Sequence, residues 1–134
     1  MKVCGIDLKA SNAILAVIEK KDDESVFIPL EIKKIALELN DEQKEMIQFY
    51  DNISGFLKVN LIDKVVIKKR AKKGNFSGGA NTFKMEAGIQ LNKVCEVSLL
   101  SSQAINSYEK KNDILIPKEV KKYQEAAYLA AICS

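Results

Sequence analysis

Short apolar stretches separated by polar turns follow one another along this chain. Residues 2–8 and 13–19 are apolar enough for two buried strands, and the polar residues between them fit a tight turn. Three further strands are predicted at 26–37, 65–67 and 94–100, and helices at 40–58, 80–91, 101–110 and from 117 onward. Three strands come first, and the later strands alternate with helices. The pattern therefore predicts an α/β fold with a mixed five-stranded sheet, three antiparallel strands followed by βα units, flanked by helices.

Individual residues sharpen this outline. Pro29 indicates that 26–37 is an edge strand, because proline cannot donate to a strand ladder. The short apolar run 65–67 is typical of a central parallel strand. Asn40 and Ser101 are expected to cap helices through their side-chain oxygens, and Pro117 is expected to open the last helix.

Length and composition describe an ordinary globular domain. The 134 residues suit one domain, 1–134, with one core, and the charged share of 29% is average. No apolar run approaches the roughly 20 residues that span a bilayer. The first residues also lack a signal-peptide pattern. We therefore expect no membrane partner and a cytoplasmic location.

The chain has no histidine. This excludes Ser-His-Asp and Cys-His catalysis, histidine metal ligands and the commonest general base. The three cysteines, Cys4, Cys95 and Cys133, form no CxxC motif, which argues against a zinc or redox pair; Cys4 and Cys95 are expected to be reduced core residues. Any catalysis would depend on carboxylates, lysines, hydroxyls or a hard cation such as Mg²⁺ or Mn²⁺.

The net charge of +3 is unevenly distributed. Residues 64–73 hold six cationic side chains and no acid, so the rest of the chain sums to −3. The basic loop that follows contains glycines and one aromatic residue, and its candidate nucleic-acid contacts are Lys68, Lys69, Arg70, Lys72, Lys73, Asn75 and Phe76. Lysines contact phosphates, glycines let backbone N–H groups approach them, and Phe76 would stack on a base. A solvated loop without a ligand is the alternative reading.

Three carboxylates are candidates for a catalytic site. Asp7 shares one face of the first strand with Val3 and Gly5. It would bind a metal or a phosphate-bound water, or it would pair with Lys9 or cap the following turn. Glu125 lies in an apolar helix, where it would serve as a site carboxylate near Asp7 or form a buried salt bridge. Glu86 would be a third site group, or would form a helix-surface pair with Gln90.

Four segments resemble a small bacterial family known as domain of unknown function 3010. They are KVCGIDLK at 2–9, VVIKKRAKKGNFSGG at 65–79, FKMEAGIQL at 83–91 and YQEAAYLAA at 123–131. The resemblance covers nearly the whole chain and implies no established activity.

A wider resemblance is to RuvC-type resolvases, which have a ribonuclease H-like fold. Those enzymes hold two magnesium ions with four carboxylates, and the resemblance implies that Asp7 matches the first of them. Lys68 and Lys69 stand where the second acid is expected. Glu125 matches one member of the final pair, while Lys122, three residues earlier, is not an acid. With two ligands missing, Asp7 and Glu125, helped by Glu86, would hold one ion.

Several functions remain open from the sequence. One is a nucleic-acid-binding protein, with Mg²⁺- or Mn²⁺-dependent nuclease activity at an altered site. Another is a non-catalytic interaction domain that keeps the fold without the chemistry. A third is an actin-like phosphotransferase, although that class needs two such domains around a nucleotide. Analogy with RuvC suggests a homodimer.

Overall fold

A computed structural model describes residues 1–69 and 79–134. Six strands lie in the described chain: β1 (Lys2–Lys9), β2 (Asn12–Lys21), β3 (Glu24–Ile28), β4 (Lys34–Ala36), β5 (Lys64–Lys68) and β6 (Glu96–Leu100). The helices are α1 (Gln43–Val59), α2 (Ala80–Gln90), α3 (Ser102–Lys111) and α4 (Glu125–Ile132), the last preceded by a 3₁₀ turn at Lys122–Gln124.

All the strands belong to one mixed sheet with the order β3-β2-β1-β5-β6, and β4 also pairs with β2. β1, β2 and β3 are antiparallel, whereas β5 lies parallel to β1 on one side and to β6 on the other. The predicted α/β sheet and the central parallel strand are therefore confirmed.

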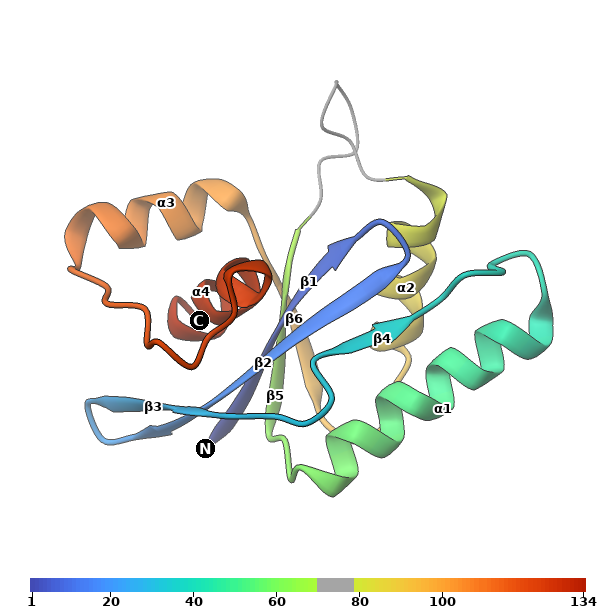
Figure 1. Cartoon of the computed structure of the whole chain (residues 1–134), viewed down its shortest axis with the longest axis horizontal. Helices are drawn as coiled ribbons and strands as arrows, with labels where there is room; N and C mark the ends of the chain where they lie inside the picture. Colours follow the sequence, from blue (N-terminus) through green and yellow to red (C-terminus); the bar gives the residue numbers. More distant parts are fainter. Residues whose placement is uncertain (70–78) are drawn as a thin grey trace.

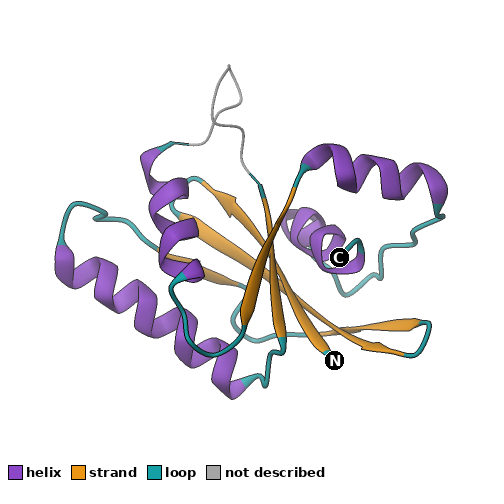
Figure 2. Ribbon diagram, turned by 180° about the vertical axis from the view of Figure 1, so that it is seen from behind, coloured by secondary structure: helices purple, strands orange, loops and turns teal. Residues whose placement is uncertain are grey.

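The helices cover both faces of the sheet (Figure 1). α1 and α2 pack on one face, where Phe49 and Met85 join Cys4, Ile6 and Leu8 in the larger core. α3 and α4 pack on the other face, and their core includes Val3, Ile14, Ile105, Ala127 and Tyr128. The view from behind shows the same two layers, with α1 and α2 on one side and α3 and α4 on the other (Figure 2).

The third strand differs from the prediction, because 26–37 forms two short strands rather than one. β3 pairs with one end of β2 and β4 with the other end. Pro29 follows β3 directly, and a residue without an N–H cannot extend the ladder. The chain therefore leaves the edge, buries Leu30 and rejoins β2 at Lys33, whose carbonyl accepts the Leu15 N–H at 2.8 Å. The predicted edge position of this segment is correct.

Two predicted helix starts are wrong. Asn40 does not cap α1, which begins after Glu42 without a side-chain cap; instead the Asn40 carbonyl and side-chain oxygens accept hydrogen bonds from Lys84 of α2. Pro117 opens a turn closed by the Val120 N–H, so α4 starts only at Glu125. Ser101 does cap α3, since its hydroxyl accepts the Ala104 N–H at 3.1 Å.

The three cysteines are free thiols, and they differ in how deeply they are buried. Cys4 is fully buried, and burial strongly raises the pKa of its thiol. Cys95 and Cys133 are half-buried, and burial is also the main cause that raises their pKa values. Protonated thiols react slowly, so none of the three is an activated nucleophile.

A thiol-specific reagent should therefore separate these cysteines under native conditions. We expect Cys95 and Cys133 to be labelled first. Cys4 should react at least about 10³-fold more slowly, because it becomes accessible only when the sheet opens. Mass spectrometry of timed samples measures each rate. Labelling of Cys4 as fast as Cys95 would contradict the buried position of β1.

Candidate functional site

The parallel strands β1, β5 and β6 all end at the same edge of the sheet. In open α/β sheets, ligands bind in the crevice outside the carboxyl ends of such strands. Asp7 lies near the end of β1 and is only 6% exposed. Its side chain belongs to the face covered by α3 and α4, because the alternate residues Ile6 and Leu8 belong to the opposite core while Val3 belongs to this one.

Asp7 lies in a row of residues that crosses the sheet. It pairs with Ile14 of β2, and Ile14 pairs with Lys34 of β4. On the other side, the parallel register ends with Ile6 opposite Ile67, so Asp7 and Lys68 are the next residues along these two adjacent strands. Strand neighbours lie about 4.8 Å apart. A lysine thus ends β5 on the same face as Asp7. The resemblance to RuvC-type resolvases implies an acid at this position.

Lys68 is half-buried and also lines a small cavity between α3 and α4. The cavity measures about 100 Å³ and is lined by Lys68, Ser102, Ile105, Asn106, Glu109, Ala126 and Leu129. A cationic side chain therefore reaches the space between the two helices at the carboxyl edge.

The position of α4 depends on Gly5 and Gln124. A Cβ on Gly5 would lie 1.8 Å from the carbonyl oxygen of Ala127, so the helix contacts the strand backbone directly. Gln124 is fully buried; its amide donates to the Leu15 carbonyl at 2.9 Å, and its carbonyl accepts the Lys121 N–H at 3.0 Å. Because Leu15 pairs with Ile6, the start of α4 lies over the part of β1 that carries Asp7.

Glu125 is the first residue of α4 and is half-buried. The structure therefore places Asp7 and Glu125 in the same layer and near the same end of β1. Glu86 lies elsewhere. It belongs to α2, whose buried residues Met85 and Ile89 pack into the core on the opposite face. The expectation that Glu86 joins the other two carboxylates does not fit this arrangement.

The number of anionic side chains at the site decides whether it can bind two metal ions as a resolvase does. Within 1–69 and 79–134, no three His, Cys, Asp or Glu side chains are close enough together to hold a metal ion. Two Mg²⁺ ions require several anionic oxygens to offset their mutual repulsion. Two carboxylates and the adjacent Lys68 do not meet that requirement, so the described residues do not fit a two-metal site.

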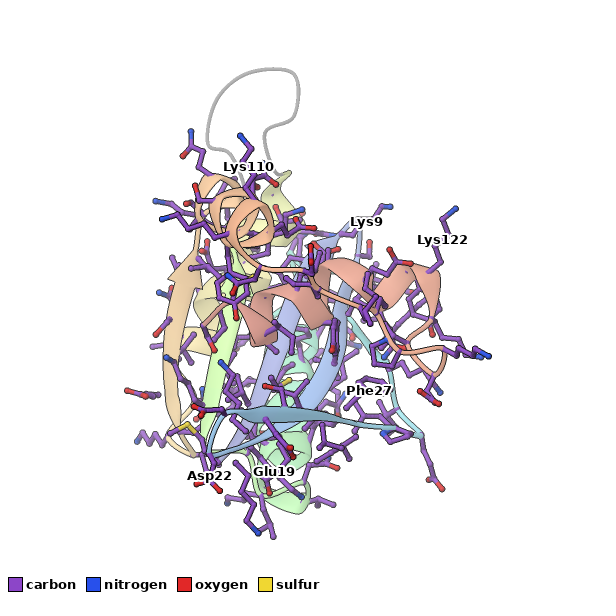
Figure 3. The ribbon with its side chains drawn as sticks, turned by 90° about the vertical axis from the view of Figure 1, so that its left-hand side faces the viewer. Lys9, Glu19, Asp22, Phe27, Lys110 and Lys122 are labelled. Atoms are coloured by element: carbon purple, nitrogen blue, oxygen red, sulfur yellow. The ribbon has the colours of Figure 1, made fainter. Side chains whose placement is uncertain are left out.

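Lysines from separate segments project from this end of the molecule. Figure 3 shows Lys9, Lys110 and Lys122 at one end, whereas Glu19 and Asp22 lie at the other. Lys69, also exposed, follows β5 and donates its N–H to the Leu100 carbonyl at 2.8 Å. Arg70, Lys72, Lys73, Asn75 and Phe76 lie outside the described residues. Even without them, exposed lysines of several separate segments lie at this end.

The start of α2 lies at the same edge. Asn81 donates to the Ser11 hydroxyl at 3.0 Å and to the Leu37 carbonyl at 3.3 Å, which ties the helix to the β1–β2 turn. Thr82 closes the first turn through its hydroxyl, which donates to the Gly79 carbonyl at 2.7 Å. The N-terminal end of α2, with its partial positive charge, therefore lies beside the end of β1. The first residue of α2, Ala80, is the start predicted from the sequence.

The family model "Protein of unknown function (DUF3010)" matches residues 1–134. The chain belongs to the DUF3010 family. No curated protein matches this DUF3010 chain in sequence. None of the helices in 1–69 and 79–134 is long and apolar enough to cross a bilayer.

Solved structures show the fold of the DUF3010 chain. RuvC of Thermus thermophilus is 11% identical with a TM-score of 0.73, and the match covers 99% of this chain and 92% of RuvC. The same protein in complex with a Holliday junction substrate gives 12% identity and a TM-score of 0.67 with the same coverage. The yeast mitochondrial resolvase Ydc2 is 12% identical with a TM-score of 0.55, over 81% of this chain and 54% of Ydc2. The ribonuclease H-like, RuvC-like fold is thus confirmed.

Proposed function

We propose that this DUF3010 protein binds nucleic acid at the carboxyl edge of its sheet, through lysine contacts to the phosphate backbone. The observation that supports this most directly is the position of Lys68 beside Asp7, together with exposed lysines of other segments at the same end. Lysine–phosphate contacts release counterions and supply most of the sequence-independent affinity for nucleic acid.

The fold supports the same proposal. Thermus thermophilus RuvC has the same fold, and its structure is known in complex with a Holliday junction substrate. From the sequence alone, Arg70, Lys72, Lys73, Asn75 and Phe76 remain candidate contacts. A DNA or RNA backbone along this edge would contact Lys9, Lys69 and Lys122 while the Lys68 ammonium faces inward.

The proposed activity is binding rather than two-metal hydrolysis. Asp7 and Glu125 are the residues that would hold a single Mg²⁺ or Mn²⁺ ion, with water completing its coordination. Lys68 opposes such an ion electrostatically, because it adds a positive charge near Asp7. A non-catalytic interaction domain with another macromolecule is the alternative, and the salt dependence of binding distinguishes the two.

The test compares two triple variants with the same change in charge. The edge variant carries Lys9→Glu, Lys69→Glu and Lys122→Glu; the control carries Lys21→Glu, Lys58→Glu and Lys93→Glu, three exposed lysines near the amino ends of the parallel strands. Fluorescence anisotropy with a four-way DNA junction, a duplex and a single strand gives the affinity at several salt concentrations. Each lost phosphate contact should lower the salt slope by about 1, so we expect a decrease of about 3 for the edge variant alone.

Two results would contradict the proposal. One is an affinity of the wild-type protein that does not change with salt. The other is an equal loss of affinity in the edge and control variants, which would indicate a general effect of net charge rather than a defined surface. Light scattering of the complex also counts the protein copies and tests the expected homodimer.

A further inference from the structure

An exposed tyrosine and a lysine from distant segments contact each other next to the basic edge. The Lys34 ammonium lies 4.3 Å from the centre of the Tyr123 ring. Tyr123 belongs to the 3₁₀ turn just before α4, and Lys34 belongs to β4. The tyrosine residue is 41% exposed, so it stays partly accessible to solvent while Lys34 lies over its ring.

This contact continues the row that contains Asp7. Lys34 pairs with Ile14, and Ile14 pairs with Asp7, so Lys34 is two strands away from the aspartate in the same register. The buried Gln124, next to Tyr123, bonds to Leu15 and holds the turn against β2. The ring is therefore attached to the sheet at a fixed place rather than on a loose segment.

The surroundings of the ring are basic. The same segment carries three exposed lysines, Lys118, Lys121 and Lys122. It carries two acids, Glu119 and Glu125. We name Lys34, Lys121, Lys122 and Tyr123 the tyrosine–lysine surface. An aromatic ring beside cations is the arrangement that single-strand-binding proteins use, with bases stacked on the ring and phosphates near the cations.

We propose that the tyrosine–lysine surface stacks an unpaired base of the nucleic acid bound at the carboxyl edge. This inference rests on the proposed function and adds a preference to it. A paired base inside a duplex has both faces covered by its neighbours and cannot reach Tyr123. An unpaired base can reach the ring while its phosphates contact Lys122 and Lys34. The surface therefore favours single strands and the open points of branched molecules over continuous duplex.

The experiment compares Tyr123→Ala, Tyr123→Phe and Lys122→Ala. The probes are a fluorescein-labelled thymidine oligonucleotide of about 20 nucleotides and a hairpin duplex of similar length. Tyr123→Ala should weaken binding to the oligonucleotide about tenfold or more, leave its salt slope unchanged and leave duplex binding unchanged. Tyr123→Phe keeps the ring and should bind like the wild type. Lys122→Ala keeps the ring but should lower the salt slope for both probes.

A second measurement tests the contact directly. Irradiation of the wild-type complex with an iodouracil-substituted oligonucleotide should produce a cross-link that mass spectrometry maps to Tyr123. If Tyr123→Ala binds the oligonucleotide as tightly as the wild type, or loses affinity equally for both probes, this inference is overturned while the proposed function stands. If the wild type binds neither probe, the proposed function fails as well. Thermal melting of each variant confirms that the fold is intact.

Discussion

Gly5→Ala should lower the free energy of unfolding by about 3 kcal/mol or more. Overpacking a core costs about 1–3 kcal/mol when side chains can move aside. Here the obstacle is backbone: the added Cβ would meet the Ala127 carbonyl oxygen at 1.8 Å and the Ala131 nitrogen at 2.9 Å. The whole of α4 would have to move away from β1. A loss of this size is a large share of the 5–15 kcal/mol that stabilises a typical domain.

Gly55→Ala is the matched control. Gly55 lies on the exposed side of α1, and a Cβ there would meet nothing within 4 Å. Alanine should therefore stabilise the helix by about 0.5–1 kcal/mol. Urea unfolding followed by circular dichroism measures both changes. Equal stability of the two variants would show that α4 does not contact β1 as closely as described.

Lys68→Glu should increase the affinity for Mn²⁺ by at least about 30-fold. The substitution replaces a cation beside Asp7 with a third carboxylate near Asp7 and Glu125. Unit charges 4 Å apart interact by about 1 kcal/mol in water and about 4 kcal/mol near a protein surface. A change from +1 to −1 near a divalent ion equals four such unit interactions, so even in water at about 8 Å it is worth about 2 kcal/mol, which corresponds to the expected gain in affinity.

Electron paramagnetic resonance of free Mn²⁺ measures this affinity during a titration. Lys69→Glu is the control, because it makes the same change in charge at the exposed neighbouring residue. Adding Asp7→Asn to Lys68→Glu should remove most of the gain. If Lys68→Glu and Lys69→Glu gain affinity equally, the gain comes from the more negative charge of the whole surface. Lys68 is then not close to Asp7. Cleavage of a four-way junction with Mn²⁺ can then be assayed in whichever variant binds the ion.

The strands and most helices could be predicted because their residues carry local signals. Continuous apolar runs predicted β1, β2 and β5, and Ser101 marked the start of α3. The alternation along β1 placed Asp7 on the correct face. Where a distant partner intervened, the local signal failed: Asn40 bonds to Lys84 of α2 instead of capping α1. The start of β6 is also later than predicted, because the Asn92 side chain accepts the Val94 and Cys95 N–H groups in a turn.

The candidate site could be predicted only in part. Asp7 and Glu125 were chosen because each is a carboxylate in an apolar element, and the structure places both on one face of the sheet; their role as site residues stays a prediction. Glu86 carried the same kind of signal, but the layer to which α2 belongs depends on tertiary packing. Lys34 and Tyr123 were missed because they are distant in sequence and neither stands out locally. Only the strand pairing of β4, β2 and β1 places Lys34 in line with Asp7. Tyr123 then comes near through its contact with Lys34.

The contact of Gly5 with α4 has a consequence for how the chain folds. The two partners are separated by most of the sequence, so the loop that joins them must close before this face of β1 is covered. Until then, the chain can form β1, β2 and the α1–α2 layer with an apolar sheet face open to solvent. Pairings of such long range slow folding and expose surfaces that favour aggregation. We therefore expect docking of α4 to be a late step, and refolding yield to fall as protein concentration rises.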